Sequence, residues 1–290
     1  DVMAAVVLAA DPKKISAVRQ NGEALEILGD GLRPAQSGLS DKAAPKIKIR
    51  RGAVIRVVKT PKNTWEITQL PEVEGAFIAL DPRDGALRAL VGGFDFNKNK
   101  FNHATQAWRQ PGSSFKPFIY SAALEKGFTP STMVNDAPLF FDAGVTGGQP
   151  WEPKNYDGKF EGPMPLHTAL AKSKNMVSIR ILQAVGTQNA QEWITRFGFE
   201  AEKHPPYLTM ALGAGSVTPM QMATAYSVFA NGGYRINPWI ITRVTDQKGK
   251  ILVESQSPPP SEAARVIDAR NAFVMNRLLQ EVARSGTAAR

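Results

Sequence analysis

One short segment combines the residue types that nucleophilic catalysis requires. Residues 110–117 are Gln-Pro-Gly-Ser-Ser-Phe-Lys-Pro, so Ser113 precedes Lys116 by one helical turn. Residues three apart on a helix share a face, and the Ser113 hydroxyl and Lys116 amine can therefore meet. A lysine shielded from water loses its proton near neutral pH and can act as a general base. This spacing predicts acyl transfer through a serine nucleophile.

Pro117 sharpens the expected place of Ser113. Inside a helix, the ring of a proline collides with the carbonyl four residues earlier, which here belongs to Ser113. Ser113 is therefore expected at or just before a helix start, where its free N–H and the helix dipole favour a developing oxyanion. The alternative is a helix-capping serine beside a solvated lysine, since about one Ser-x-x-Lys is expected by chance in such a chain.

A second polar cluster, Ser173-Lys174-Asn175, lies between two predicted helices. A serine hydroxyl at such a corner can relay a proton, and an asparagine amide can orient both the lysine and a substrate amide. The alternative is a polar turn that only joins the two helices. Together the two clusters give the candidate catalytic residues Ser113, Lys116, Ser173 and Asn175.

The elements around these residues predict two domains. Residues 4–73 predict a small β-barrel or sandwich: residues 4–9 are apolar, Asn21-Gly22 favours a tight turn, and residues 46–50 (Lys-Ile-Lys-Ile-Arg) alternate with period two. Residues 54–58 and 65–70 continue the pattern. Such a barrel can bind oligonucleotides, but this one has a single Trp and few other aromatic side chains for stacking bases. We therefore expect no nucleic-acid partner.

Residues 74–290 predict a domain of the α+β class, with strands followed by segregated helices. A strand, turn and strand are expected over 76–91, and a second hairpin over 236–244 and 251–254. Gly, Pro and Asn punctuation and helical periodicity predict helices at 115–126, 166–172, 177–185, 190–197, 219–230 and 269–283.

Composition excludes several classes of site. The chain has 290 residues, no cysteine and three scattered histidines, so neither thiolate nor paired-histidine metal sites are expected. Each histidine is expected to be an ordinary surface or satisfied core residue. No run of about eighteen apolar residues is present to span a bilayer. The formal charge of +9 suits an anionic partner without identifying it.

Beyond these arguments, the chain resembles the penicillin-binding proteins, and most closely their class A members. The order Ser-x-x-Lys then Ser-x-Asn is that of their transpeptidase domains, and the stretches 112–118, 212–223 and 229–234 look like stretches of that family. Residues 4–73 look like the small OB-like barrel inserted before the catalytic fold. The resemblance implies a penicillin-binding transpeptidase or serine β-lactamase-like fold, with an antiparallel sheet and helices.

This resemblance also implies a function. Ser113 would attack the D-alanyl-D-alanine end of a peptidoglycan stem peptide, with Lys116 as base, Ser173 as proton relay and Asn175 as orienting group. An acceptor amine or water would then release the acyl group, and β-lactams would acylate Ser113. No metal or organic cofactor is implied. The whole protein is expected to carry a glycosyltransferase domain and an inner-membrane anchor, with its catalytic domains in the periplasm and an accessory protein on the barrel.

The third family motif, Lys-Thr-Gly on a strand, is absent. Residues 284–287 (Arg-Ser-Gly-Thr) follow a predicted helix and are expected to be its terminating turn. Either the 74–290 domain is incomplete at its C-terminus, which the abrupt end favours, or the chain is an inactive relative. Two other functions stay open: a serine β-lactamase, although no glutamate has the expected partner pattern, and a non-catalytic penicillin sensor or scaffold.

Overall fold

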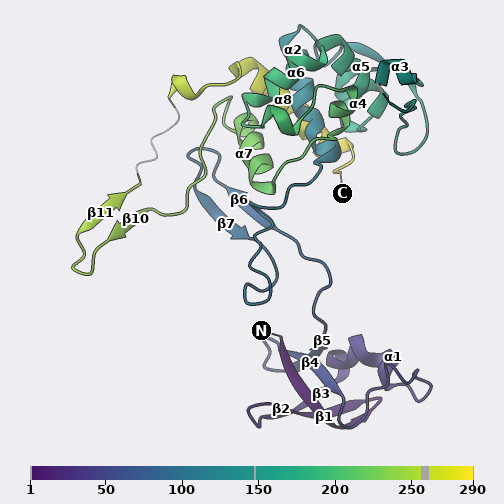
Figure 1. The fold of residues 1–290 in the computed structure, drawn as a ribbon, viewed down its shortest axis with the longest axis vertical. Helices are drawn as coiled ribbons and strands as arrows, with labels where there is room; N and C mark the ends of the chain where they lie inside the picture. The colour runs from purple at the N-terminus through teal and green to yellow at the C-terminus, as the bar shows by residue number, and fades with distance from the viewer. Residues whose placement is uncertain (1, 147, 256–260, 290) are drawn as a thin grey trace. The chain divides into compact units, whose positions relative to one another are not determined.

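The protein is described by a computed structural model covering residues 2–146, 148–255 and 261–289 (Figure 1). The chain divides into two compact units, Asp1–Glu74 and Gly75–Arg290. Each unit has its own hydrophobic core. Within the described residues, no helix combines the length and the apolarity needed to cross a bilayer.

The first unit is a five-stranded antiparallel sheet with the order β3-β2-β1-β4-β5. Contacts between β3 and β5 bring the two edge strands together, as in a small barrel. Side chains alternate between the two faces, so Val7, Ile15, Ile27 and Val57 are each 0% exposed. The strands are β1 (Met3–Asp11), β2 (Lys14–Arg19), β3 (Ala24–Leu28), β4 (Val54–Lys59) and β5 (Trp65–Thr68), with a 3-10 turn (Gly29–Ala35) and α1 (Gln36–Leu39) between β3 and β4.

One strand prediction in this unit was wrong. Residues 46–50 alternate with period two, yet they form turns and irregular chain. Ile47 is 53% exposed, whereas Ile49 packs against the core and donates its N–H to the carbonyl of Gly38 at 2.9 Å. A period-two pattern becomes a strand only where a neighbouring strand accepts its hydrogen bonds, and here a helix end takes that place.

The second unit combines short hairpins with a cluster of helices. β6 (Phe77–Leu80) pairs with β7 (Leu87–Val91), as predicted. The other hairpins are β8 (Met133–Asp136) with β9 (Gly162–Pro165), and β10 (Arg243–Thr245) with β11 (Ile251–Glu254), so only the end of the predicted strand 236–244 is a strand. The predicted helices are confirmed; with α3, they are α2 (Lys116–Glu125), α3 (Ala143–Thr146), α4 (Leu166–Ala171), α5 (Asn175–Val185), α6 (Thr187–Thr195), α7 (Pro219–Ala230) and α8 (Ala269–Ser285).

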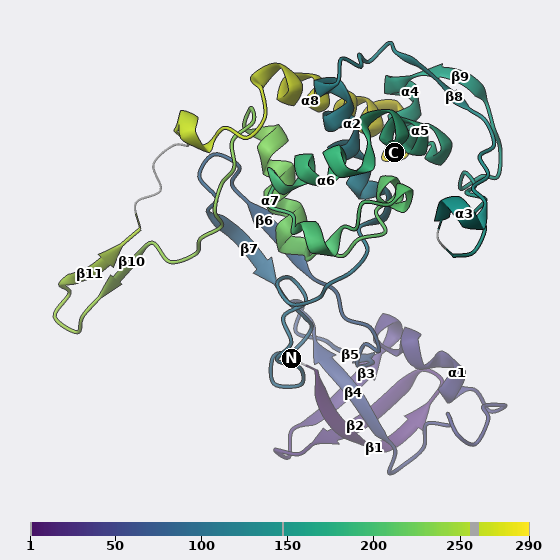
Figure 2. The ribbon, with the colours of Figure 1, turned by 45° about the horizontal axis from the view of Figure 1, so that its top comes forward.

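Helix α2 is the central element of this unit. It contacts α5, α6 and α8 (Figure 2). Its residues Phe118, Ile119 and Tyr120 point in different directions around the helix, yet each is 0% exposed. A helix that is apolar all round is stable only inside a core. The body of α2 is therefore fixed by packing, and its N-terminal tip is held by that rigid helix.

Candidate active site

Ser113 lies at the tip of α2, in a 3-10 turn formed by Gly112–Phe115. Its carbonyl accepts a hydrogen bond from the N–H of Lys116, because Pro117 has no N–H for the usual α-helical bond. The Ser113 side chain is exposed and lines a cavity of about 490 Å³. Ser113 therefore lies just before α2, where Pro117 predicts it.

Two glycines hold the turn that carries Ser113 in place. Gly112 and Gly213 both have positive φ, 57° and 69°, and the Gly112 N–H donates to the Gly213 carbonyl at 3.3 Å. A Cβ at Gly213 would lie 2.1 Å from the Gly112 oxygen. The hydroxyl of Tyr226 also donates to the Ser114 carbonyl, at 2.7 Å. The turn that carries Ser113 thus depends on a close backbone contact that only glycine allows.

Replacing Gly213 by alanine is expected to displace this turn. The new Cβ would clash with Gly112 and would also strain a left-handed backbone, so we expect a loss of about 2 kcal/mol or more in unfolding free energy. Acylation of Ser113 by a fluorescent penicillin should also slow. Gly232→Ala is the control, because Gly232 has φ +88° but nothing within 4 Å of its Cβ. Equal labelling rates in the two variants would contradict the role of the close contact.

The amine of Lys116 is buried beside the second motif. The residue is 1% exposed, and its Nζ donates to the Ser173 carbonyl (2.8 Å), the Ser173 hydroxyl (3.0 Å) and Oδ1 of Asn175 (2.7 Å). Burial lowers the pKa of Lys116 to about 8. The structure thus brings Lys116, Ser173 and Asn175 together, while no hydrogen bond joins Lys116 to the Ser113 hydroxyl among the described residues.

Ser173 occupies a position where glycine is the usual residue. Its φ is +55°, and it follows the last turn of α4. The N–H of Ser173 donates to the Leu170 carbonyl (3.0 Å), and the N–H of Lys174 donates to the Ala169 carbonyl (2.9 Å). These two bonds define a Schellman helix end, which normally carries glycine at this left-handed position. A serine kept there despite the strain points to use of its hydroxyl.

Ser173→Gly is expected to slow acylation while leaving the free energy of unfolding nearly unchanged. Relief of backbone strain offsets the lost hydrogen bond and the greater freedom of the unfolded chain, so stability should change by less than about 1 kcal/mol. The rate of acylation should nevertheless fall by about 10²-fold, because the hydroxyl beside Lys116 is gone. Asn63→Gly, at the other non-glycine residue with positive φ among those described (63°), should leave labelling unchanged. A Ser173→Gly variant with the parent's rate would rule out a role for this hydroxyl.

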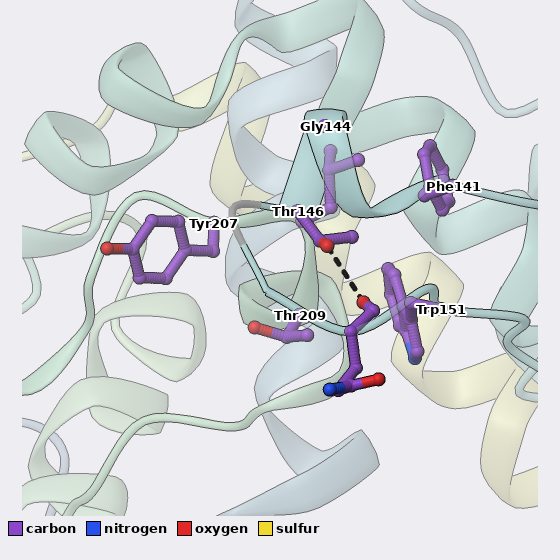
Figure 3. A pocket seen from close by; sticks show the side chains of 8 residues that line it. Phe141, Gly144, Thr146, Trp151, Tyr207 and Thr209 are labelled. Carbon is purple, nitrogen blue, oxygen red and sulfur yellow. Dashed lines mark hydrogen bonds between the residues drawn. The ribbon is translucent and has the colours of Figure 1, made fainter.

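Two cavities compete as the site of chemistry. The cavity with Ser113 is also lined by Ser173, Asn175, Lys174 and Asp157. A slightly larger cavity, about 520 Å³, is lined instead by aromatic, hydroxyl and amide side chains without any carboxylate or amine (Figure 3). It contains none of the candidate residues. We place the candidate site in the cavity of Ser113, because the exposed Ser113 lines it together with Ser173, whose hydroxyl accepts a hydrogen bond from the buried amine of Lys116.

Sequence reasoning missed five residues that line the cavity of Ser113: Asn155, Tyr156, Asp157, Lys172 and Thr287. Thr287 comes from the turn that follows α8. The turn after α8 was expected to be only a helix end, and α8 does end at Ser285. However, the N–H of Thr287 donates to the carbonyl of Ala171 at 3.0 Å, which brings the turn to the end of α4. The sequence did contain one signal, the glycine at position 286, because glycine allows a close backbone approach. In the structure, a Cβ at Gly286 would lie 2.3 Å from the carbonyl oxygen of Ala171.

The three histidines make contacts outside the cavity of Ser113. His103 bonds the Gly92 carbonyl, and His167 bonds Glu281 at 2.8 Å. His204 is 1% exposed and stacks on Phe115 at 4.8 Å, and burial lowers its pKa to about 4. No protein group in the described part of the chain bonds its ring nitrogens, so the place of His204 in the core rests on ring packing. No group of three or more metal-ligating residues occurs in that part.

Comparisons with known proteins agree with this geometry. Residues 75–290 match the penicillin binding protein transpeptidase domain, and residues 1–73 match the penicillin-binding protein OB-like domain. Penicillin-binding protein 1A of Neisseria flavescens is 46% identical over 285 residues, which cover 98% of this chain and 36% of that protein. The chain thus spans about a third of the length of the curated relatives it matches.

Solved structures show the same fold. The crystal structure of penicillin-binding protein 1A from Haemophilus influenzae superposes with a TM-score of 0.86 at 31% identity, over 99% of this chain and 45% of that one. The structure of PonA1 from Mycobacterium tuberculosis in complex with penicillin V gives a TM-score of 0.61 at 25% identity, over 73% of this chain and 58% of that one. Motifs, fold and relatives agree, and the chain belongs to the penicillin-binding protein transpeptidase family.

Proposed function

We propose that this chain is the transpeptidase part of a peptidoglycan synthase that cross-links stem peptides through a serine acyl-enzyme. The observation that carries the proposal is the buried amine of Lys116, held at 2.7–3.0 Å by Ser173 and Asn175 next to the cavity that Ser113 lines. A surface lysine would stay protonated. Here burial lowers the pKa of the amine to about 8, so its neutral form is accessible near neutral pH.

In the first step, Ser113 attacks the penultimate D-alanine carbonyl of a stem peptide. The Ser113 oxygen bonds to the carbonyl carbon, and its proton passes to neutral Lys116. The amine takes this proton on its one lone pair and becomes an ammonium with three N–H donors, which suit the Ser173 carbonyl, the Ser173 hydroxyl and Oδ1 of Asn175. Ser173 can therefore relay the proton to the leaving amine as the carbon–nitrogen bond breaks and D-alanine departs.

In the second step, an amine of another stem peptide attacks the Ser113 ester. The new amide bond forms, the ester bond breaks, and the proton of the amine returns to the Ser113 oxygen through the same groups. Water in place of the amine gives a minor carboxypeptidase reaction. A β-lactam resembles the dipeptide but keeps its leaving group tethered, so Ser113 stays acylated. The relative PonA1 has been solved in complex with penicillin V, which supports β-lactam binding by this fold.

Family membership extends the proposal to the whole protein. We infer a bifunctional class A synthase with a glycosyltransferase domain, held in the inner membrane with its catalytic region in the periplasm. The OB-like unit offers a surface for an accessory protein. Val6 and Val54 are register partners on adjacent strands and are 42% and 66% exposed, and Leu8 on the same strand as Val6 is 45% exposed. These exposed apolar side chains support a protein partner on this unit.

The test is to incubate the intact protein with a fluorescent penicillin and with a D-alanyl-D-alanine stem peptide plus an amine acceptor. Stable labelling together with D-alanine release and a cross-linked product supports the proposal. Stable labelling without any product would identify a penicillin sensor or scaffold. Rapid loss of the label with hydrolysed penicillin would identify a β-lactamase. Absence of labelling would reject all three acyl-enzyme functions.

A further inference from the structure

The first turn of α5 is capped by a side chain from another segment. The N-cap residue, Lys174, makes no side-chain capping bond itself. Instead Oδ1 of Asn155 accepts hydrogen bonds from the backbone N–H groups of Asn175 (2.8 Å) and Met176 (3.4 Å). Asn155 is only 5% exposed, and it lines the cavity of Ser113. A buried amide thus serves the helix end that carries part of the candidate active site.

Asp136 sets the orientation of this amide. Nδ2 of Asn155 donates to Oδ1 of Asp136 and to the Lys159 carbonyl, both at 2.7 Å. Asp136 ends β8 and is 0% exposed, and its Oδ2 accepts the N–H of Glu161 at 3.0 Å. Both amide protons of Asn155 are therefore used, one of them by a charged acceptor, so Oδ1 must face α5.

The residue before Asn155 holds the side chain of Asn175. Nδ2 of Asn175 donates to the Lys154 carbonyl at 2.8 Å. This bond turns Oδ1 of Asn175 toward Lys116, whose Nζ lies 2.7 Å away. Lys154 and Asn155 thus hold Asn175 by its side chain and by its backbone. If either contact loosened, Lys116 would lose one of its acceptors.

A buried lysine next to this corner pairs with three carboxylates. Lys174 is 3% exposed, and its Nζ forms ion pairs with Glu161 (2.8 Å), Asp136 (3.5 Å) and Asp157 (3.5 Å). Burial opposes its charge, but these carboxylates outweigh burial and raise its pKa. Glu161 also pairs with Lys172. Asp136 therefore serves both the amide of Asn155 and the ammonium of Lys174.

We propose that Asn155, oriented by Asp136, is a positioning residue for the acylation of Ser113. It acts by fixing Asn175 so that Oδ1 accepts a hydrogen bond from Lys116, which keeps the amine aligned for proton transfer. The inference rests on the proposed function, because Lys116 is the base of that reaction. The competing interpretation is a cap that stabilises α5 and has no effect on the reaction.

The test is the acylation of the intact protein by a fluorescent penicillin, with the binding constant and the acylation rate constant measured separately over pH 6–10. Asn155→Leu should lower the acylation rate constant by about 10–100-fold with little change in binding. An acceptor stabilises the charged amine, so a weaker bond from Asn175 should also move the midpoint of the pH profile to lower pH. An unchanged rate constant and profile in folded Asn155→Leu would overturn the proposal.

Asn189→Leu is a matched control at the opposite end of the same helix. Nδ2 of Asn189 donates to the carbonyl of Val185, the last residue of α5, at 2.9 Å. Its loss should weaken α5 without touching Asn175. The proposal expects the parent's rate constant and pH profile in this control. If Asn189→Leu lowers the rate as much as Asn155→Leu does, helix stability explains the effect and the proposal fails.

A charge swap covers the case in which Asn155→Leu does not fold. Asn155→Asp alone sets one carboxylate against another at Asp136 and should slow acylation. The double variant Asp136→Asn with Asn155→Asp restores an amide–carboxylate pair, and the new carboxylate can still accept from α5. The acylation rate constant of the double variant should be at least tenfold higher than that of Asn155→Asp alone. If a folded double variant acylates no faster than Asn155→Asp, the inference about Asn155 is rejected. If the parent protein itself is not labelled by penicillin, the proposed function is rejected.

Discussion

Ser113→Ala is expected to abolish covalent labelling by penicillin. The acyl-enzyme requires an oxygen at this position, and no water or neighbouring side chain can form the same stable ester. The exposed Ser113 side chain lies at the tip of a fully packed helix, so its loss should not disturb folding. The measurement is gel fluorescence after incubation with a fluorescent penicillin, together with a thermal melt that should match the parent.

Ser114→Ala is the matched control for this prediction. Ser114 is also exposed and lies in the same turn, but its hydroxyl donates to the Pro111 carbonyl at 2.6 Å. Loss of this bond should cost about 1 kcal/mol of stability and leave labelling intact. The assignment of Ser113 as the nucleophile fails if Ser113→Ala still forms a stable penicillin adduct. It also fails if Ser114→Ala forms no adduct.

Lys116→Met is expected to slow acylation by about 10²–10⁴-fold, because the general base is lost. In the proposed mechanism the neutral amine is the active form, and burial lowers the pKa of Lys116 to about 8. The acylation rate should therefore rise from pH 6 through pH 8 and level off above that. In Lys116→Met this rise should disappear. Stopped-flow measurement of the acylation rate constant across this range gives both results.

Lys116→Arg separates the base from the charge. Arginine keeps the positive charge but does not deprotonate in this range, so the variant should be as slow as Lys116→Met. Recovery of activity in Lys116→Arg would show that Lys116 acts only as a cation.

The pH dependence of protein stability provides a second check on the pKa of Lys116. Burial lowers the pKa of Lys116 from 10.5 to about 8, so between these values the unfolded chain binds more protons. The contribution of Lys116 to stability should rise with pH across that window and be absent in Lys116→Met.

Local features of the site could be predicted because their causes are local. The collision of the Pro117 ring with the Ser113 carbonyl depends only on residues four apart, and it places Ser113 just before α2. Likewise, Gly and Pro punctuation located the helices within a few residues. The missed hairpin is the opposite case. β9 contains Gly162, Pro163 and Pro165, which disfavour a strand, yet pairing with β8 imposes an extended chain.

Contacts between distant segments could not be predicted in the same way. Lys116 and Asn175 meet because α2 and α5 pack in one core, and the expectation that Asn175 orients Lys116 came from the order of the two motifs and a family resemblance, not from local sterics. Asn155 and Asp136 lie in segments without helical or strand periodicity strong enough to read, and their roles follow from burial. Thr287 joins the cavity only because Gly286 can approach the Ala171 carbonyl.

The sequence by itself determined the chemistry that is available: one serine at a helix start, one lysine a turn later and a Ser-Lys-Asn corner. Residue types and short-range sterics are sufficient for that. Only the tertiary structure decided that the amine of Lys116 is buried and shared between Ser173 and Asn175. The physical reason is that the pKa of a lysine depends on desolvation and on nearby acceptors, and both come from segments that are brought together only when the core forms.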